Sequence, residues 1–184
     1  MVREAECYSR FLHGDKKAIE DVIREYKDGL IFYIYSIIGD IHKSEELAVD
    51  TFIKLFTEKP NFNGDGSFKT WLYSIGRFTT VDYIRKNKNI TEVPLENAYA
   101  LSDDKNIEQG FIHDEEKIKL HKKISRLKPE YSQILYLIYF ENFSHDETAK
   151  IMKKSRKQIN DLLYRAKNAL KKEIEKENEF YDEL

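Results

Sequence analysis

The stretch Ser67–Lys88 constrains the fold more than any other part of the chain. It holds the only tryptophan, begins with Ser67 as the expected cap of a helix, and repeats its apolar residues at helical spacing. One face of the expected helix carries Phe68, Trp71, Leu72, Ile75, Phe78 or Thr79, and Asp82. A second face carries Lys69, Tyr73, Arg77, Val81, Arg85 and Lys88. The first face predicts a core anchored by the indole. The second is a basic ridge with an aromatic in it, which is typical of surfaces that bind single-stranded nucleic acid but also fits an ordinary solvated helix face.

The rest of the composition agrees with a helical protein. The 184 residues suffice for one medium domain or two small ones, and they include only seven Gly and three Pro. So few turn formers, among 35% charged residues, favour an all-α fold. The net charge of −2 argues against a protein that coats nucleic acid along its whole surface, although it is compatible with local basic patches.

Cysteine usage and hydropathy indicate the compartment. Cys7 is the only cysteine, which excludes an intramolecular disulfide and a zinc site built from cysteines. The longest apolar run, Leu30–Ile38, falls far short of the ~20 residues that span a bilayer. The N-terminal residues contain no apolar signal core. We therefore expect a soluble protein of the reducing cytoplasm, without a membrane segment.

Three further helices are expected before this stretch and one long acidic segment after it. Residues 3–13 and 16–38 show helical periodicity, interrupted at Gly14 and ended by Gly39-Asp40. A helix over 44–56 has Ser44 as its expected cap and an outer face of Glu45, Glu46, Asp50 and Lys54, which by itself fits an acidic solvated face. Residues 91–116 are acidic, with little apolar periodicity, and predict a linker between domains 1–90 and 117–184.

The C-terminal part predicts a helix-turn-helix. Pro129 suits the first turn of an apolar helix, Ser144 and Glu147 form a capping-box pattern, and a turn at 153–155 precedes a last helix over about 156–175. Nine bases and one acid, Asp161, lie between positions 150 and 172. A basic second helix is typical of major-groove recognition, although a lysine-rich exposed face would look similar. The candidate DNA-binding residues are Arg156, Lys157, Gln158 and Asn160 for base edges, and Tyr164, Arg165 and Lys167 for phosphates.

The segment Phe62–Arg85 (F-x-G-x-G-S-F-K-T-W-L-Y-x-I-G-R-x-x-x-x-D-Y-x-R) resembles conserved region two of the extracytoplasmic-function sigma factors of the sigma-70 family. Gly76 and Phe78 depart from the Ala and Asn that this family usually has there. The resemblance implies a loop that holds a flipped base and a helix that lines the opened strand or the adjacent duplex. The residues implied in minus-ten recognition and melting are Phe62, Asn63, Gly64, Lys69, Tyr73, Arg77, Arg85, Lys86 and Lys88.

The same resemblance implies a polymerase-docking helix over 44–56, with Glu45, Glu46, Asp50 and Lys54 as its contact residues. Here Ser44, Glu46 and Val49 replace the Ala, Asp and Gln of the family pattern. Residues 127–170 resemble conserved region four, which binds the minus-thirty-five element, with Lys153 in place of the usual turn glycine. The implied partners are core RNA polymerase and promoter DNA. Many relatives are also held inactive by an anti-sigma protein, and the sequence leaves open whether one exists here.

No catalytic constellation is found. The five histidines have no spacing that would converge on a metal, and no P-loop, nucleophile elbow or H-E-x-x-H pattern occurs. We expect neither an enzyme nor a cofactor. Two alternatives to a sigma factor stay open: a stand-alone helix-turn-helix regulator that binds duplex operator DNA, and a helical adaptor whose basic helices bind an acidic partner.

Overall fold

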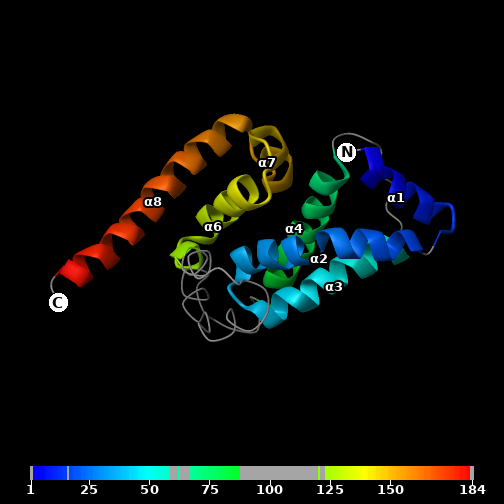
Figure 1. Cartoon of the computed structure of the whole chain (residues 1–184), viewed down its shortest axis with the longest axis horizontal. Coiled ribbons are helices and arrows are strands. Elements are labelled where there is room, and N and C mark those ends of the chain that lie inside the picture. Colours follow the sequence, from blue (N-terminus) through cyan, green and yellow to red (C-terminus); the bar gives the residue numbers. More distant parts are fainter. Residues whose placement is uncertain are drawn as a thin grey trace.

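The computed structural model describes residues 2–15, 17–58, 62, 67–87, 120 and 123–182. Within these residues the protein is helical and contains no strand. Figure 1 shows an N-terminal domain and a C-terminal domain. The N-terminal domain comprises α1 (Val2–Leu12), α2 (Lys17–Ile38), α3 (Ile41–Thr57) and α4 (Phe68–Asn87). The C-terminal domain comprises α6 (Pro129–Leu135), the π-helical turn η2 (Tyr136–Phe140), α7 (His145–Met152) and α8 (Arg156–Asp182). The expected all-α class is confirmed, while the predicted linker lies outside the described residues.

Two glycines set the boundaries of α2, as the sequence predicts. Gly14 has φ +101° between α1 and α2, and Gly39 has φ +72° directly after α2. Side chains other than glycine rarely adopt this left-handed backbone, so each glycine allows the chain to leave a helix. The N–H of Gly39 donates to the carbonyl of Tyr35 at 2.8 Å and completes the last turn.

The start of α3 differs from the prediction. Asp40, not Ser44, caps this helix, because its carboxylate accepts a hydrogen bond from the Lys43 N–H at 2.9 Å. Ser44 lies inside the helix, is buried, and donates its hydroxyl to the carbonyl of Asp40 at 2.6 Å. Both residues are good caps, and the sequence offered them one turn apart. The inward residues of α3 are predicted correctly: Leu47, Ala48, Thr51, Phe52 and Leu55 are buried.

Helix α2 forms the centre of the molecule. It packs against α1, α3 and α4 of its own domain and also against α6 of the C-terminal domain. Its buried residues therefore occupy more than one face, and Leu30, Tyr33 and Ile34 are fully buried. The predicted anchor, Trp71, lies at the edge of the core: its indole is partly buried, 5.2 Å from the ring centres of Tyr8 and Phe62.

The C-terminal domain has the predicted helix-turn-helix. The capping box of Ser144 and Glu147 begins α7, and the turn before α8 follows Met152. Lys153 occupies this turn with φ +52°, the left-handed conformation that glycine adopts at little cost. Helix α8 extends to Asp182, beyond its expected end, and Lys171 pairs with Glu175, one turn further along the helix, at 3.6 Å.

The strained turn residue gives a stability prediction. Lys153→Gly should increase the free energy of unfolding by about 1 kcal/mol, because the left-handed backbone no longer carries a Cβ. Lys150→Gly is the control: it puts glycine inside α7 and should lower stability by about 1 kcal/mol. Thermal and denaturant unfolding of the three proteins checks both signs. A loss of stability in Lys153→Gly would contradict the strain.

Candidate nucleic-acid interface

The predicted duplex-binding residues share the exposed face of α8. All seven of them are exposed: Arg156, Lys157, Gln158, Asn160, Tyr164, Arg165 and Lys167. The buried residues Ile159 and Ala166 fix the opposite face against the domain core, since each of them is 0% exposed. The helix thus presents its basic side chains to solvent next to the turn, the geometry that a major-groove reader requires.

Three of these side chains have partners within the domain. Arg156 forms an ion pair with Asp146 at 3.0 Å, and Asn160 is hydrogen-bonded to the ring of His145 at 2.7 Å. The amide oxygen of Gln158 accepts the backbone N–H of Ser155 at 2.7 Å, while the Ser155 hydroxyl accepts the N–H of Gln158. This is a second capping box, recognisable in the sequence as Ser-x-x-Gln but missed there. It occupies the Gln158 oxygen and leaves the amide NH₂ for a base.

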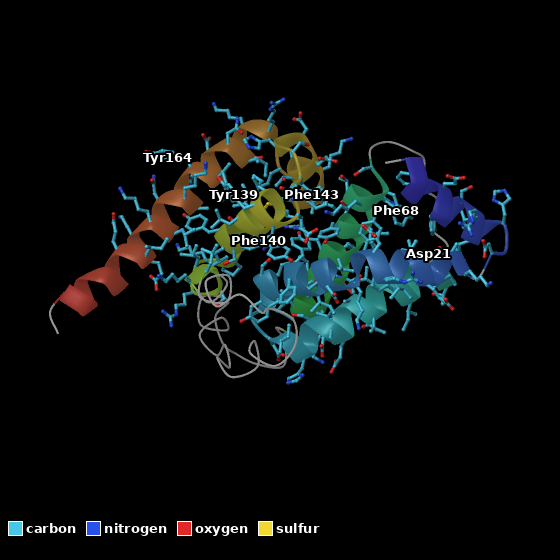
Figure 2. The ribbon with its side chains drawn as sticks, in the orientation of Figure 1. Asp21, Phe68, Tyr139, Phe140, Phe143 and Tyr164 are labelled. Atoms are coloured by element: carbon cyan, nitrogen blue, oxygen red, sulfur yellow. The ribbon has the colours of Figure 1, made fainter. Side chains whose placement is uncertain are left out.

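An exposed aromatic pair extends this face. Tyr164 is 69% exposed and Tyr139, in η2, is 51% exposed, and both are labelled in Figure 2. The Lys167 ammonium lies 5.5 Å from the ring centre of Tyr139, which joins the π-helical turn to α8. Tyr139 was not predicted as a surface residue, because a periodicity of 3.6 residues does not anticipate a π-helical turn.

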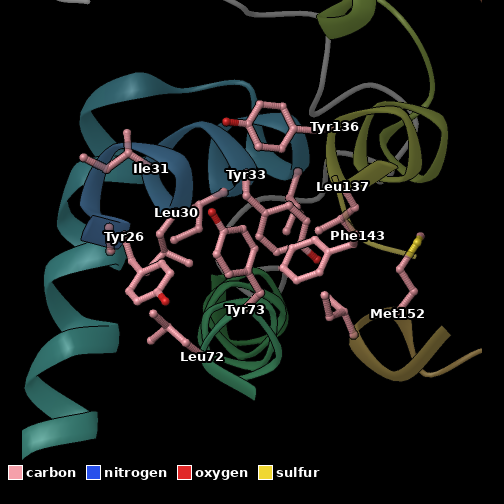
Figure 3. Close-up of a cluster of buried hydrophobic side chains, with 14 of the residues drawn as sticks. Tyr26, Leu30, Ile31, Tyr33, Leu72, Tyr73, Tyr136, Leu137, Phe143 and Met152 are labelled. Atoms are coloured by element: carbon pink, nitrogen blue, oxygen red, sulfur yellow. The ribbon is translucent and has the colours of Figure 1, made fainter. Parts of the chain in front are cut away.

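The predicted strand-binding ridge of α4 has a different environment. Lys69, Tyr73 and Arg77 follow one another at intervals of four residues, and we call them the α4 stripe. Tyr73 was expected on a ridge facing away from the core, but it is 0% exposed. Its ring lies 5.4 Å from that of Tyr33 and 5.0 Å from that of Phe143 in the C-terminal domain (Figure 3). Burial, with the nearby Glu141 carboxylate, raises the pKa of the Tyr73 hydroxyl well above its ordinary value.

The other two residues of the α4 stripe are partly covered. The Lys69 ammonium lies 2.8 Å from the Glu141 carboxylate, donates to the Glu141 carbonyl at 2.9 Å and sits 4.9 Å from the ring centre of Phe143. The Nε of Arg77 is buried and has no hydrogen-bond partner among the described residues. Thus the segment between η2 and α7, which carries Glu141 and Phe143, covers part of the predicted single-strand surface.

Glu147 joins the starts of α4 and α7. One of its carboxylate oxygens accepts from the hydroxyls of Ser67 and Thr70, at 3.2 and 3.0 Å. The other accepts from the N–H and the hydroxyl of Ser144, at 3.0 and 2.8 Å. Ser67 is the cap that the sequence predicts for α4, because its hydroxyl accepts the N–H of Thr70 at 3.1 Å. Burial opposes ionisation of Glu147, but the hydrogen bonds from Ser144, Thr70 and Ser67 outweigh it and lower its pKa.

The other predicted strand residues that the structure describes are Phe62, Arg85 and Lys86. Arg85 and Lys86 are exposed at the end of α4 and pair with Asp82 at 2.7 and 2.8 Å, and the Lys86 hydrogen bond leads in lowering the Asp82 pKa. Phe62 packs on Phe68 and Trp71, with ring centres 5.9 and 5.2 Å away. Asn63, Gly64 and Lys88 lie outside the described residues.

The outer face of α3 is exposed to solvent. Glu45, Glu46 and Asp50 are exposed, as expected, while Lys54 donates to the Thr79 hydroxyl at 3.3 Å and is partly buried. Val49 and Ile53, one helical turn apart, are each 52% exposed between the charged residues. An exposed apolar pair inside a charged rim is typical of a protein-binding face. The i, i+4 spacing of these two residues is visible in the sequence, but their exposure was not predicted.

Two absences can be stated for the part of the chain that the structure describes. No group of three histidine, cysteine, aspartate or glutamate residues is placed to hold a metal ion there. No described helix is both long and apolar enough to cross a membrane. Among the described residues, the exposed candidate surfaces are the basic face of α8 and the mixed acidic and apolar face of α3, while the α4 stripe is partly covered.

Comparison with known proteins finds the same family in the N-terminal and the C-terminal part of the chain. A model described as sigma-70 region 2 matches residues 22–90, and one described as sigma-70 region 4 matches residues 117–170. RNA polymerase sigma factor YlaC from Bacillus subtilis is 28% identical over 166 residues, covering 89% of this chain and 96% of YlaC. ECF RNA polymerase sigma factor SigW from the same organism is 26% identical over 170 residues, covering 88% and 91% of the two chains.

Two solved structures have a similar fold. The structure of CnrH in complex with the cytosolic domain of CnrY superposes with a TM-score of 0.64 at 16% identity, covering 95% of this chain and 96% of that one. The sigma factor RpoE, in complex with the anti-sigma factor NepR from Bartonella quintana, gives 0.63 at 22% identity, covering 85% and 98%. At these identities the likeness establishes the fold.

The bridging carboxylate predicts a pH effect. Because the folded pKa of Glu147 lies below its ordinary value of 4.5, the stability it contributes is present above that value and is lost as pH falls through the folded pKa. The stability difference between wild type and Glu147→Gln should therefore shrink between about pH 7 and about pH 3. Unfolding of both proteins across this range, with the exposed Glu130→Gln as control, measures it. A difference that stays constant with pH would show that the charge of Glu147 is not what matters.

Proposed function

The chain belongs to the sigma-70 family, as a sigma factor of the extracytoplasmic-function group, and from this premise we propose which of its surfaces binds the polymerase, which binds the upstream promoter element and which captures the opened strand. As a sigma factor it binds core RNA polymerase, recognises promoter elements and initiates transcription. Sigma factors act by binding, and we propose no catalytic step for this chain. The assignment of residues rests on the open faces of α3 and α8 and on the composition of α4.

The α8 face binds the upstream promoter element. Its support is the exposure of all seven predicted residues on the second helix of a helix-turn-helix. Arg156 and Lys157 stand at the N-terminal end, where a recognition helix contacts base edges, whereas Arg165 and Lys167 lie about two to three turns later and suit phosphates. Arginine can donate two hydrogen bonds to guanine once it exchanges the exposed Asp146 carboxylate for the base.

The α3 face docks on the polymerase. Glu45, Glu46 and Asp50 surround the exposed Val49 and Ile53, so an apolar contact is available inside a polar rim. Helix α3 is held rigidly from behind by its buried residues, which lets the exposed face bind without reordering.

Helix α4 and the loop before it capture the opened strand. Opening a duplex unstacks bases at a few kcal/mol each, and the protein must offer aromatic and cationic groups to the released bases. Tyr73 and Phe62 provide the rings, and Lys69, Arg77, Arg85 and Lys86 the charges. The similar fold of the sigma factor RpoE, solved in complex with the anti-sigma factor NepR, supports the proposal that an anti-sigma protein also binds this chain.

A variant of α3 tests polymerase docking. The double charge reversal Glu45→Lys/Asp50→Lys should weaken retention on purified core polymerase at least about tenfold, because it inverts the polar rim. Glu25→Lys, on an exposed position of α2, is the matched control and should bind as wild type. Full retention of the double variant would remove α3 from docking. No binding of wild type to core, together with tight binding to duplex DNA, would favour a stand-alone regulator.

A pair of α8 variants separates base reading from phosphate binding. Arg156→Ala should change the preferred upstream sequence in a selection from randomised duplexes, since it removes a donor for guanine. Lys171→Ala should leave the preferred sequence unchanged, weaken binding to all duplexes and reduce the salt slope by about one. Unchanged selectivity in Arg156→Ala would exclude that residue from base reading.

A further inference from the structure

Helix α7 packs against α8 and binds two of the residues that are expected to read bases. The Nδ1 of His145, the first residue of α7, lies 2.7 Å from the side-chain oxygen of Asn160. A guanidinium nitrogen of Arg156 donates to the carboxylate of Asp146, the next residue of α7, at 3.0 Å. The start of α7 therefore touches the side chains that face the bases of the upstream element.

The contact with His145 fixes the orientation of the Asn160 amide. An amide oxygen can only accept a hydrogen bond, so the Nδ1 of His145 carries the proton and donates it. The oxygen of Asn160 is thus bound to the protein, while its NH₂ group lies on the other arm of the amide. Because Asn160 is exposed, this NH₂ group is available to DNA.

Gln158 has the same polarity for a different reason. Its side-chain oxygen accepts the backbone N–H of Ser155 at 2.7 Å in the capping box that starts α8. This bond satisfies a backbone group at the helix end, so it holds the oxygen against the backbone and leaves the NH₂ group for a base. Arg156 has donors only, whatever its orientation. All three residues, Arg156, Gln158 and Asn160, therefore present hydrogen-bond donors to DNA.

The four bases differ in what they offer to such donors. In the major groove guanine presents two acceptors, N7 and O6, whereas adenine presents the acceptor N7 beside its N6 amino group, a donor. Asparagine and glutamine read adenine by placing the oxygen and the nitrogen of one amide side by side on this edge. An amide whose oxygen is bound to the protein cannot do so. Donor-only side chains therefore favour guanine over adenine.

We propose that His145 is a positioning residue that makes Asn160 a donor-only reader, so that Asn160 selects guanine against adenine at one position of the upstream element. This inference rests on the proposed binding of the upstream element by α8. Asp161, the one acid among the nine bases of this region, is an exposed acceptor one turn after Lys157. Its carboxylate suits the N4 amino group of a cytosine and does not change the polarity of the Asn160 amide.

Selection from randomised upstream duplexes, by the full chain assembled with core polymerase, tests this assignment. Asn160→Ala identifies the position that Asn160 reads, because the base preference is lost there. Wild type should prefer guanine to adenine at this position by at least about fivefold. His145→Ala should lower the ratio below about twofold, since the released amide can turn toward adenine. His42→Ala, the same substitution at an exposed histidine of α3, should keep the wild-type ratio.

A double variant distinguishes positioning from a general structural role. If His145 acts through Asn160, adding His145→Ala to Asn160→Ala should change neither the affinity nor the base preference further. A further loss of affinity would instead give His145 a structural role and overturn the proposal. So would a wild-type preference for adenine at the Asn160 position, a guanine preference that survives His145→Ala, or an Asn160→Ala protein that selects as wild type does. If wild type selects no upstream sequence at all, the proposed function of α8 fails, and this inference fails with it.

Discussion

The contact on which the arrangement depends is the enclosure of Tyr73 between Tyr33 of α2 and Phe143 of the C-terminal domain. It makes the buried side chains of both domains one continuous cluster, although the chain consists of two helical domains. Helix α2 contacts both α4 and α6, so its aromatic residues serve two cores at once. This explains why α2 carries buried residues on more than one face, where a helix at the surface of a small domain would carry one apolar stripe.

The polar contacts around Tyr73 are fixed by the way the short C-terminal helices end and begin. The N–H of Glu141 closes the π-helical turn by donating to Tyr136, and Asn142 then takes a left-handed conformation, which directs the chain toward α7. Glu147 is placed by the capping box that starts α7. Local helix-ending chemistry therefore positions two carboxylates opposite the start of α4. The polar contacts between the domains therefore use carboxylates that already lie at the end of η2 and at the start of α7.

The sequence predicts where the helices begin and end better than it predicts what surrounds their side chains. The helix boundaries at Gly14 and Gly39, the caps at Ser67 and Ser144 and the turn at Lys153 follow from local chemistry, and local chemistry is what a sequence displays. The predicted cap of α3 is wrong because Asp40 and Ser44, one turn apart, are both residue types that cap helices well. The burial of Tyr73 could not be predicted, since periodicity shows which residues share a face and not what covers that face.

The ambiguity of the α4 stripe has a chemical origin. A surface that captures bases needs aromatic rings and cations, and the same groups suit an interface that offers rings and carboxylates in return. Phe143 meets the Tyr73 ring edge to face, and the Glu141 carboxylate pairs with the Lys69 ammonium. The C-terminal domain therefore satisfies the stripe with the same kinds of contact that a DNA strand would make. The proposed strand binding and the observed packing therefore use the same two side chains, Lys69 and Tyr73.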